Sequence, residues 1–242
     1  MKNISFILLA SLILGCVDQP TITLKKFEGS PEYSNSILDL SQITEDENFN
    51  INFNFELENY ELGIQTLGAG ENGLANSAQG QHIHMIVDNG PYSAHYSSDF
   101  SKELKNGNNL ILFFLSRSFH ESVKNPNAFS LIQLSSGEQD YGPYDLDSEF
   151  LFYSRPKGVY EGDDTKKLLL DFYLVNTEIS PEGNKVRATI NENEFIIDEW
   201  APYYIEGLPL GEVTVKLELL NSNGELIDSP FNPVVRKVTL VN

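Results

Sequence analysis

The chain has one cysteine in 242 residues, Cys16. An intrachain disulfide is therefore excluded, and the fold must rest on a hydrophobic core. A free thiol in an exported protein would need a partner, so this single cysteine requires its own explanation.

Long hydrophobic runs are also missing. No stretch approaches the roughly 18 apolar residues of a membrane-spanning helix. Residues 4–14 form a shorter apolar run after Lys2, which is typical of a signal-peptide core. Residues 13–16 (ILGC) resemble the lipobox at which signal peptidase II cuts before a diacylated cysteine. We predict a signal peptide over residues 1–15 and lipidation of Cys16, with an ordinary secretory signal and a chance cysteine as the alternative.

Basic residues are scarce: 16 Lys and Arg stand against 35 Asp and Glu, for a net charge of −19. Such acidity disfavours nucleic acids and anionic lipid headgroups as partners, because both would be repelled. The lipid on Cys16 would be the membrane attachment. We therefore predict a protein anchored in a bacterial cell envelope, with the outer membrane favoured, facing the periplasm or the exterior.

Signatures of catalysis and nucleotide binding are lacking too. The sequence has no P-loop, no dinucleotide fingerprint and no nucleophile elbow. We also find no long amphipathic helical pattern. The sequence instead has short runs in which apolar and polar residues alternate, separated by turns such as residues 88–90, 106–107 and 223–224. This pattern is typical of an all-β protein. We expect no enzymatic activity.

The body of the chain repeats itself. Residues 55–62 (FELENYEL) match 172–179 (FYLVNTEI), and residues 80–88 (GQHIHMIVD) match 183–191 (GNKVRATIN). Two later segments match in the same order. A repeat of about a hundred residues of β-strand has the size of an immunoglobulin-like sandwich. We predict a tether over residues 16–35, then two tandem immunoglobulin-like β-sandwich domains over residues 36–137 and 144–242.

All four histidines lie in the first repeat. His82 and His84 share one face of a strand, because side chains alternate. They align with Lys185 and Arg187 of the second repeat, so both should point away from the core. Two imidazoles on one strand face are half of a copper or zinc site, and His120 is the candidate third ligand.

A fourth ligand could come from His95, Glu121 or Asp99. The alternative is that the histidines are surface or hydrogen-bonded residues that bind no metal.

A second candidate site adjoins His120. Arg117 and Lys124 could hold an anion or a phosphate group beside Glu121, and we take these three as candidate ligand-binding residues. The first repeat also has a long connection at residues 63–79, rich in Gly, Ala and Asn. Long loops of this kind are often functional, which favours the first repeat as the ligand-binding one.

Three segments carry a family resemblance: residues 81–88 (QHIHMIVD), 114–122 (FLSRSFHES) and 152–158 (FYSRPKG). They resemble an uncharacterised family of bacterial envelope lipoproteins, some of which are labelled phosphopeptide-binding proteins. The resemblance implies peptide or phosphate binding at most and assigns no residue roles.

The sequence therefore leaves three hypotheses. The first is a lipid-anchored, non-enzymatic binding module for a peptide, a phosphopeptide or another envelope protein. The second is a copper- or zinc-binding envelope protein, and the third is a structural part of an envelope assembly.

Overall fold

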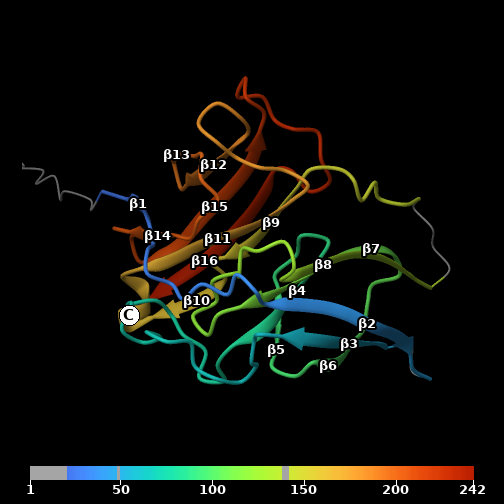
Figure 1. Ribbon diagram of the computed structural model, residues 1–242. Coiled ribbons are helices and arrows are strands. Elements are labelled where there is room, and N and C mark those ends of the chain that lie inside the picture. Colours follow the sequence, from blue (N-terminus) through green and yellow to red (C-terminus); the bar gives the residue numbers. More distant parts are fainter. Residues whose placement is uncertain (1–20, 48–49, 138–141) are drawn as a thin grey trace, which may run out of the picture.

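The computed structural model describes residues 21–47, 50–137 and 142–242, and the fold is all-β as predicted. Two β-sandwiches are stacked so that four sheets form four layers (Figure 1). The outer and inner sheets of the first sandwich have the orders β2-β3-β6 and β5-β4-β7-β8. The inner and outer sheets of the second have the orders β9-β11-β14-β1 and β10-β16-β15-β12-β13.

The strands of the first sandwich are β2 (Ile37–Glu45), β3 (Ile51–Glu58), β4 (His82–Val87), β5 (Ser93–His95), β6 (Asp99–Lys102), β7 (Gly107–Ser116) and β8 (Phe129–Ser136). Those of the second are β1 (Thr23–Lys26), β9 (Phe150–Arg155), β10 (Gly158–Glu161), β11 (Leu168–Val175), β12 (Lys185–Ile190), β13 (Asn193–Ile197), β14 (Tyr203–Glu206), β15 (Gly211–Leu220) and β16 (Val234–Val241). A short 3-10 helix, η1 (Gly162–Thr165), follows β10. All registers are antiparallel except that of β10 with β16.

Strands of the inner sheets are more fully buried than strands of the outer sheets. In the outer strand β12 buried residues alternate with half-buried ones, as expected when one face meets solvent. In β9 and β11 every residue is buried, because each inner sheet has a sandwich core on one face and the other sandwich on its second face. Phe114 and Tyr173 stack across this junction with ring centroids 4.9 Å apart. The two sandwiches therefore share a third apolar core.

The internal repeat is visible in the backbone. Asn59 and Asn176, at matching places in the two copies, both have positive φ, 54° and 57°. Asp88 and Asn191 also match, with φ of 50° and 53°. The side chain of Asp88 accepts a hydrogen bond from the Leu110 amide in β7. In the same way, the side chain of Asn191 accepts one from the Thr214 amide in β15, the equivalent strand of the second copy. Copies that share such local detail are repeats of one sandwich.

The N-terminal part of the fold corrects one expectation. Residues 16–35 were expected to be a tether, yet Thr23–Lys26 forms β1 and pairs with β14 at the edge of the second sandwich (Figure 1). The predicted signal peptide and Cys16 lie outside the described residues, as does most of the joint expected between Gly137 and Tyr144.

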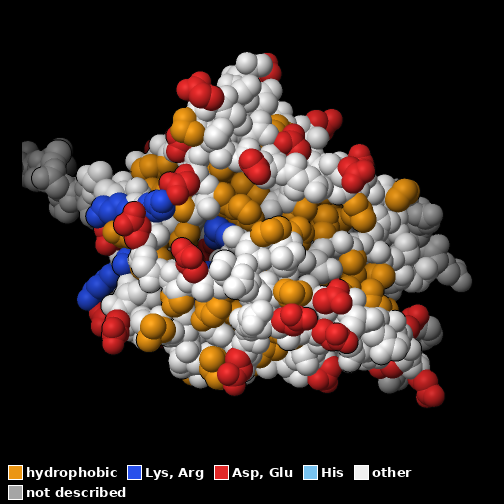
Figure 2. Space-filling model, in the orientation of Figure 1, with side chains coloured by type: hydrophobic (Ala, Val, Ile, Leu, Met, Phe, Trp, Pro, Cys, Tyr) orange, Lys and Arg blue, Asp and Glu red, His pale blue; other side chains and the backbone are white. Residues whose placement is uncertain are grey.

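Acidic side chains are spread over the face seen in Figure 2, whereas Lys and Arg show mainly beside β1. The two lysines of β1 are already paired, Lys25 with Glu206 and Lys26 with Glu199. None of the helices in the described ranges is long and apolar enough to cross a membrane.

Candidate functional site

His82 and His84 lie on β4, with their side chains on the face opposite Ile83 and Met85. The two apolar residues enter the first sandwich core, so the expected direction of the histidines is confirmed. Neither histidine reaches solvent, however, because both have 0% exposed surface. The second sandwich covers this face of the inner sheet. The equivalent face of β12, which carries Lys185 and Arg187, is only half-buried.

His120 reaches the same place from the turn after β7. This turn has the same hydrogen bonds as its counterpart in the second sandwich: Arg117 bonds with Glu121 as Asn221 does with Glu225. His120 has a φ of 68°, a left-handed conformation that few residues other than glycine adopt. The histidine is therefore held in place at some conformational cost, which the surrounding structure must offset.

The long connection at residues 63–79 braces this turn. The Thr66 amide donates to the Ser118 hydroxyl at 3.1 Å, and the Ser118 amide donates to the Thr66 hydroxyl at 2.9 Å. The Ser77 amide donates to the Ser118 carbonyl, and Leu74 packs against Phe119. The expected functional loop thus has a positioning role, because it fixes the turn that carries His120.

Three ring nitrogens converge between β4 and the turn. His82 Nε2 lies 2.8 Å from His84 Nε2 and 3.1 Å from His120 Nδ1, and all three nitrogens lie within 4.8 Å of one another. His82 Nδ1 is 2.8 Å from the Gly80 carbonyl and donates to it, which leaves the lone pair of His82 on Nε2. His84 Nε2–H can donate to this lone pair, and the Tyr92 hydroxyl, 3.3 Å from His120 Nδ1, can donate to His120. One cation at this point would instead be bound by all three nitrogens.

The three imidazoles are held neutral. Burial lowers the pKa of His82 to about 4, although the hydrogen bond to Gly80 acts the other way. Burial is also the main cause that lowers the pKa of His84 and of His120, and the charge of Arg155 adds to it in both. A neutral imidazole is the form that binds metal, so these nitrogens are available as ligands at neutral pH.

Neither His95 nor Glu121 supplies the fourth ligand considered from the sequence. His95 donates to or accepts from Ser93 at 2.8 Å and stacks on Phe100, so it belongs to another part of the first sandwich. Glu121 binds Arg117 instead. Within the described residues, the grouping that could hold a metal consists of His82, His84 and His120.

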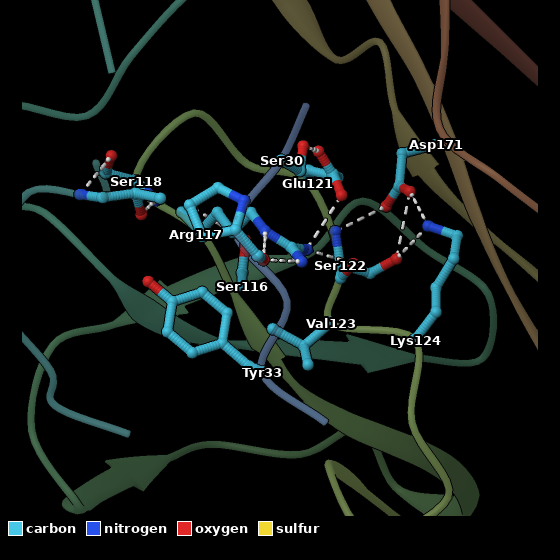
Figure 3. Close-up of polar contacts among 12 residues, drawn as sticks. Ser30, Tyr33, Ser116, Arg117, Ser118, Glu121, Ser122, Val123, Lys124 and Asp171 are labelled. Atoms are coloured by element: carbon cyan, nitrogen blue, oxygen red, sulfur yellow. Dashed lines mark hydrogen bonds and ion pairs between the residues drawn. The ribbon is translucent and has the colours of Figure 1, made fainter. Parts of the chain in front are cut away.

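The candidate anion site contains ion pairs (Figure 3). Arg117 binds Glu121 at 2.8 Å, and both side chains are almost fully buried. Lys124 Nζ lies 2.5 Å from Asp171, a fully buried residue of β11 in the second sandwich. Both cations are therefore neutralised by carboxylates, although Arg117, Glu121 and Lys124 do line one pocket of about 390 Å³.

Burial raises the pKa of Glu121, while the charge of Arg117 opposes that shift. Asp171 also accepts hydrogen bonds from the Ser122 amide and hydroxyl. These contacts tie the turn of the first sandwich to β11, so Lys124 has a role in holding the sandwiches together. Arg117 and Glu121 pair with each other within the turn. Ligand binding by them stays a prediction.

Sequence reasoning missed the neighbours that the second sandwich and the β4–β5 connection supply. The Tyr92 ring stacks on His84 with centroids 3.6 Å apart, and Arg155 and Lys157 lie over the Tyr92 ring. In the sequence, the segment at residues 152–158 carries a family resemblance and no indication of a site. No signal along the chain places it against β4, because more than sixty residues separate the two.

Comparisons with known proteins give distant likenesses. No protein-family model matches the chain, and no curated protein matches it. Among solved structures, the fibronectin(III)-like modules of Clostridium thermocellum CbhA align at 9% identity over 85% of this chain and 94% of theirs, with a TM-score of 0.30. The chicken CNTN1 FN1–FN3 domains align at 12% identity over 89% of this chain and 70% of theirs, with a TM-score of 0.25.

The extracellular domain of the putative one component system BT4673 from B. thetaiotaomicron aligns at 10% identity over 84% of this chain and 37% of that one, with a TM-score of 0.26. The assignment of two stacked immunoglobulin-like sandwiches rests on the strand order described above.

Proposed function

We propose that this chain is a non-enzymatic, lipid-anchored envelope protein that binds a copper or zinc ion with His82, His84 and His120. The observation that carries the proposal is the convergence of three neutral ring nitrogens within 4.8 Å. Metal–nitrogen bonds of about 2.0–2.1 Å would place ligand nitrogens somewhat farther apart than the 2.8 Å and 3.1 Å between these atoms. Small rotations of the rings would accommodate the ion.

The second sandwich supports this proposal as an internal comparison. Its residues at the three equivalent places are Lys185, Arg187 and Gly224, none of which is among the usual ligands of copper or zinc. The histidines therefore belong to the first copy alone and are not needed to build this kind of sandwich. Held at a positive φ, His120 also costs free energy that a glycine would avoid.

A phosphopeptide has less support. Recognition of a phosphate group needs free cationic side chains. Arg117 and Lys124 are the two cations of the candidate pocket, and each already binds a buried carboxylate. A phosphate would have to displace Glu121 or Asp171, so we rank phosphopeptide binding at this pocket below metal binding.

The test is a metal titration of the full chain carrying Cys16→Ser, which removes its thiol. Chelator-stripped protein should bind one equivalent of copper or zinc, and the His82→Ala/His84→Ala variant should bind none at the same concentration. The matched control is Lys185→Ala/Arg187→Ala, which changes the equivalent strand of the second sandwich. Absence of stoichiometric binding in protein that remains folded would refute the proposal.

A further inference from the structure

The surroundings of the three histidines carry positive charge. Arg155 Cζ lies 5.3 Å from the centroid of the Tyr92 ring, and Lys157 Nζ lies 4.1 Å from it. The same ring stacks on His84 at 3.6 Å and lies 5.9 Å from the ring of His120. Two cationic side chains therefore contact the same tyrosine ring that stacks on His84, one of the three ligands.

Among the described residues, hydroxyl and carbonyl groups, and not carboxylates, are the hydrogen-bond partners of these two charges. Arg155 donates to the Tyr160 hydroxyl at 2.9 Å, and Lys157 donates to the Tyr92 carbonyl at 2.6 Å. In the parts of the chain that the structure describes, neither residue forms an ion pair with Asp or Glu, unlike Arg117 and Lys124. An ion bound by the histidines would meet net repulsion from this side.

The ligand set is also small and dry. His82 and His84 have 0% exposed surface, and His120 is half-buried at the edge of the site. Catalytic and open zinc sites complete a tetrahedron with a fourth ligand, commonly water. Cu(I) is monovalent and forms stable complexes with only two or three neutral nitrogen ligands, so it needs neither a fourth ligand nor a counter-charge.

We propose that the histidine site is selective for Cu(I) over Zn(II) and Cu(II). This inference rests on the proposed function and specifies the ion of that same site. Coulomb repulsion from one cation several ångströms away, at an effective dielectric constant of about 20, disfavours a dication over a monocation by about 10- to 100-fold in affinity. Both Arg155 and Lys157 act in this direction.

The experiment compares affinities by chelator competition on the full chain carrying Cys16→Ser. Cu(I) is kept reduced with ascorbate under nitrogen and competed with bicinchoninate, while Zn(II) and Cu(II) are competed with a colorimetric pyridylazo chelator. We expect one Cu(I) per chain, bound at least 100-fold more tightly than Zn(II). The copper X-ray absorption edge should be that of a three-coordinate nitrogen site.

Charge variants test the cause. Lys157→Met removes one cation from the half-buried edge, and Lys237→Met removes an exposed lysine of the outer sheet as the matched control. A dication feels each charge twice as strongly as a monocation. Lys157→Met should therefore raise Zn(II) affinity by about the square of the factor by which it raises Cu(I) affinity, and Lys237→Met should change neither.

Arg155→Met provides a second variant with the same expected direction, should the backbone contact of Lys157 prove necessary for folding. Histidine-dependent binding of Zn(II) or Cu(II) as tight as that of Cu(I) would overturn the selectivity and leave the proposed function standing. Failure of all three ions to bind folded protein would overturn both.

Discussion

His120 in the first sandwich and Gly224 in the second occupy the same place in the same turn, with φ of 68° and 81°. Both amides donate to the residue three positions earlier, Arg117 or Asn221. The fold thus needs a left-handed residue here, and glycine meets that need without strain. The first copy carries an imidazole instead, and its Nδ1 lies 3.1 Å from His82 Nε2.

The first prediction follows from this pair. His120→Gly should leave the free energy of unfolding of metal-free protein unchanged or raise it by about 1 kcal/mol, because the left-handed strain is relieved. It should also abolish stoichiometric metal binding. Urea unfolding and metal titration of the same preparation measure both effects.

Gly224→His is the converse variant. It should lower the free energy of unfolding by about 1–3 kcal/mol, since it imposes the strain without a ligand site. Retention of full metal affinity in His120→Gly would show that His120 is not a ligand.

The second prediction concerns pH. The pKa of His82 is lowered to about 4 in the folded protein, and those of His84 and His120 are lowered as well. The unfolded chain, with histidine pKa values near 6.5, then binds more protons than the folded one. Stability present above pH 6.5 should be lost as the pH falls, with a slope of up to about 1.4 kcal/mol per pH unit for each histidine.

Urea unfolding of metal-free protein between pH 7.5 and pH 5 measures this slope. A His82→Gln/His84→Gln variant should give a flatter dependence over the same range. Equal slopes in the two proteins would mean that the buried histidines do not cause the loss.

A third prediction addresses the contact between the sandwiches. Asp171→Asn removes the buried carboxylate that binds Lys124 and leaves that cation, whose side chain is 12% exposed, unpaired. Loss of one partner of a buried pair costs about 3–5 kcal/mol, so the free energy of unfolding should fall by that amount. The matched variant Glu212→Gln breaks the exposed pair with Lys237 and should cost less than about 1 kcal/mol. Similar losses in both would remove the structural role given to Asp171.

The fourth prediction compares two glycines at the ends of the long connection: Gly63 begins it, and Gly80 directly follows it. Both have an unusual backbone conformation, but only one lacks room for a side chain. Gly80 and Gly63 both have positive φ, 85° and 78°. A Cβ on Gly80 would lie 2.4 Å from the Ile64 carbonyl oxygen, whereas one on Gly63 would meet nothing within 4 Å. Gly80→Ala should therefore lower the free energy of unfolding by about 1–3 kcal/mol more than Gly63→Ala does.

Gly80→Ala should also weaken metal binding, because the Gly80 carbonyl orients His82. Calorimetric titration of both alanine variants measures this, and equal affinities would show that the orientation of His82 does not depend on Gly80.

The lipid anchor gives the fifth prediction. Mass spectrometry of protein from bacterial membranes should find a mature chain that begins at Cys16 and carries acyl groups. Cys16→Ser should appear in the soluble fraction or remain uncut. Wild-type protein that begins elsewhere and carries no lipid would support the ordinary secretory signal instead.

The sequence by itself determined the all-β class, the repeat and the direction of the histidine pair. Each follows from local regularities: strand alternation places His82 and His84 on one face, and the aligned Lys185 and Arg187 show that this face points away from the core of its own sandwich. The candidate third ligand, His120, was also named from the sequence, and it lies in the turn after β7, the strand that pairs with β4.

Tertiary structure alone decided what surrounds these residues. The alternation of residues along a strand shows which side chains point away from the core of their own sandwich. It carries no information about a second sandwich that covers those side chains. The burial of His84, the approach of Arg155 and Lys157, and the neutralisation of Lys124 by Asp171 all come from that packing. Likewise, β1 joined the second sandwich because β14 offered a free edge, which a polar N-terminal segment does not reveal. The character of the site is set by contacts between residues that lie far apart in the chain.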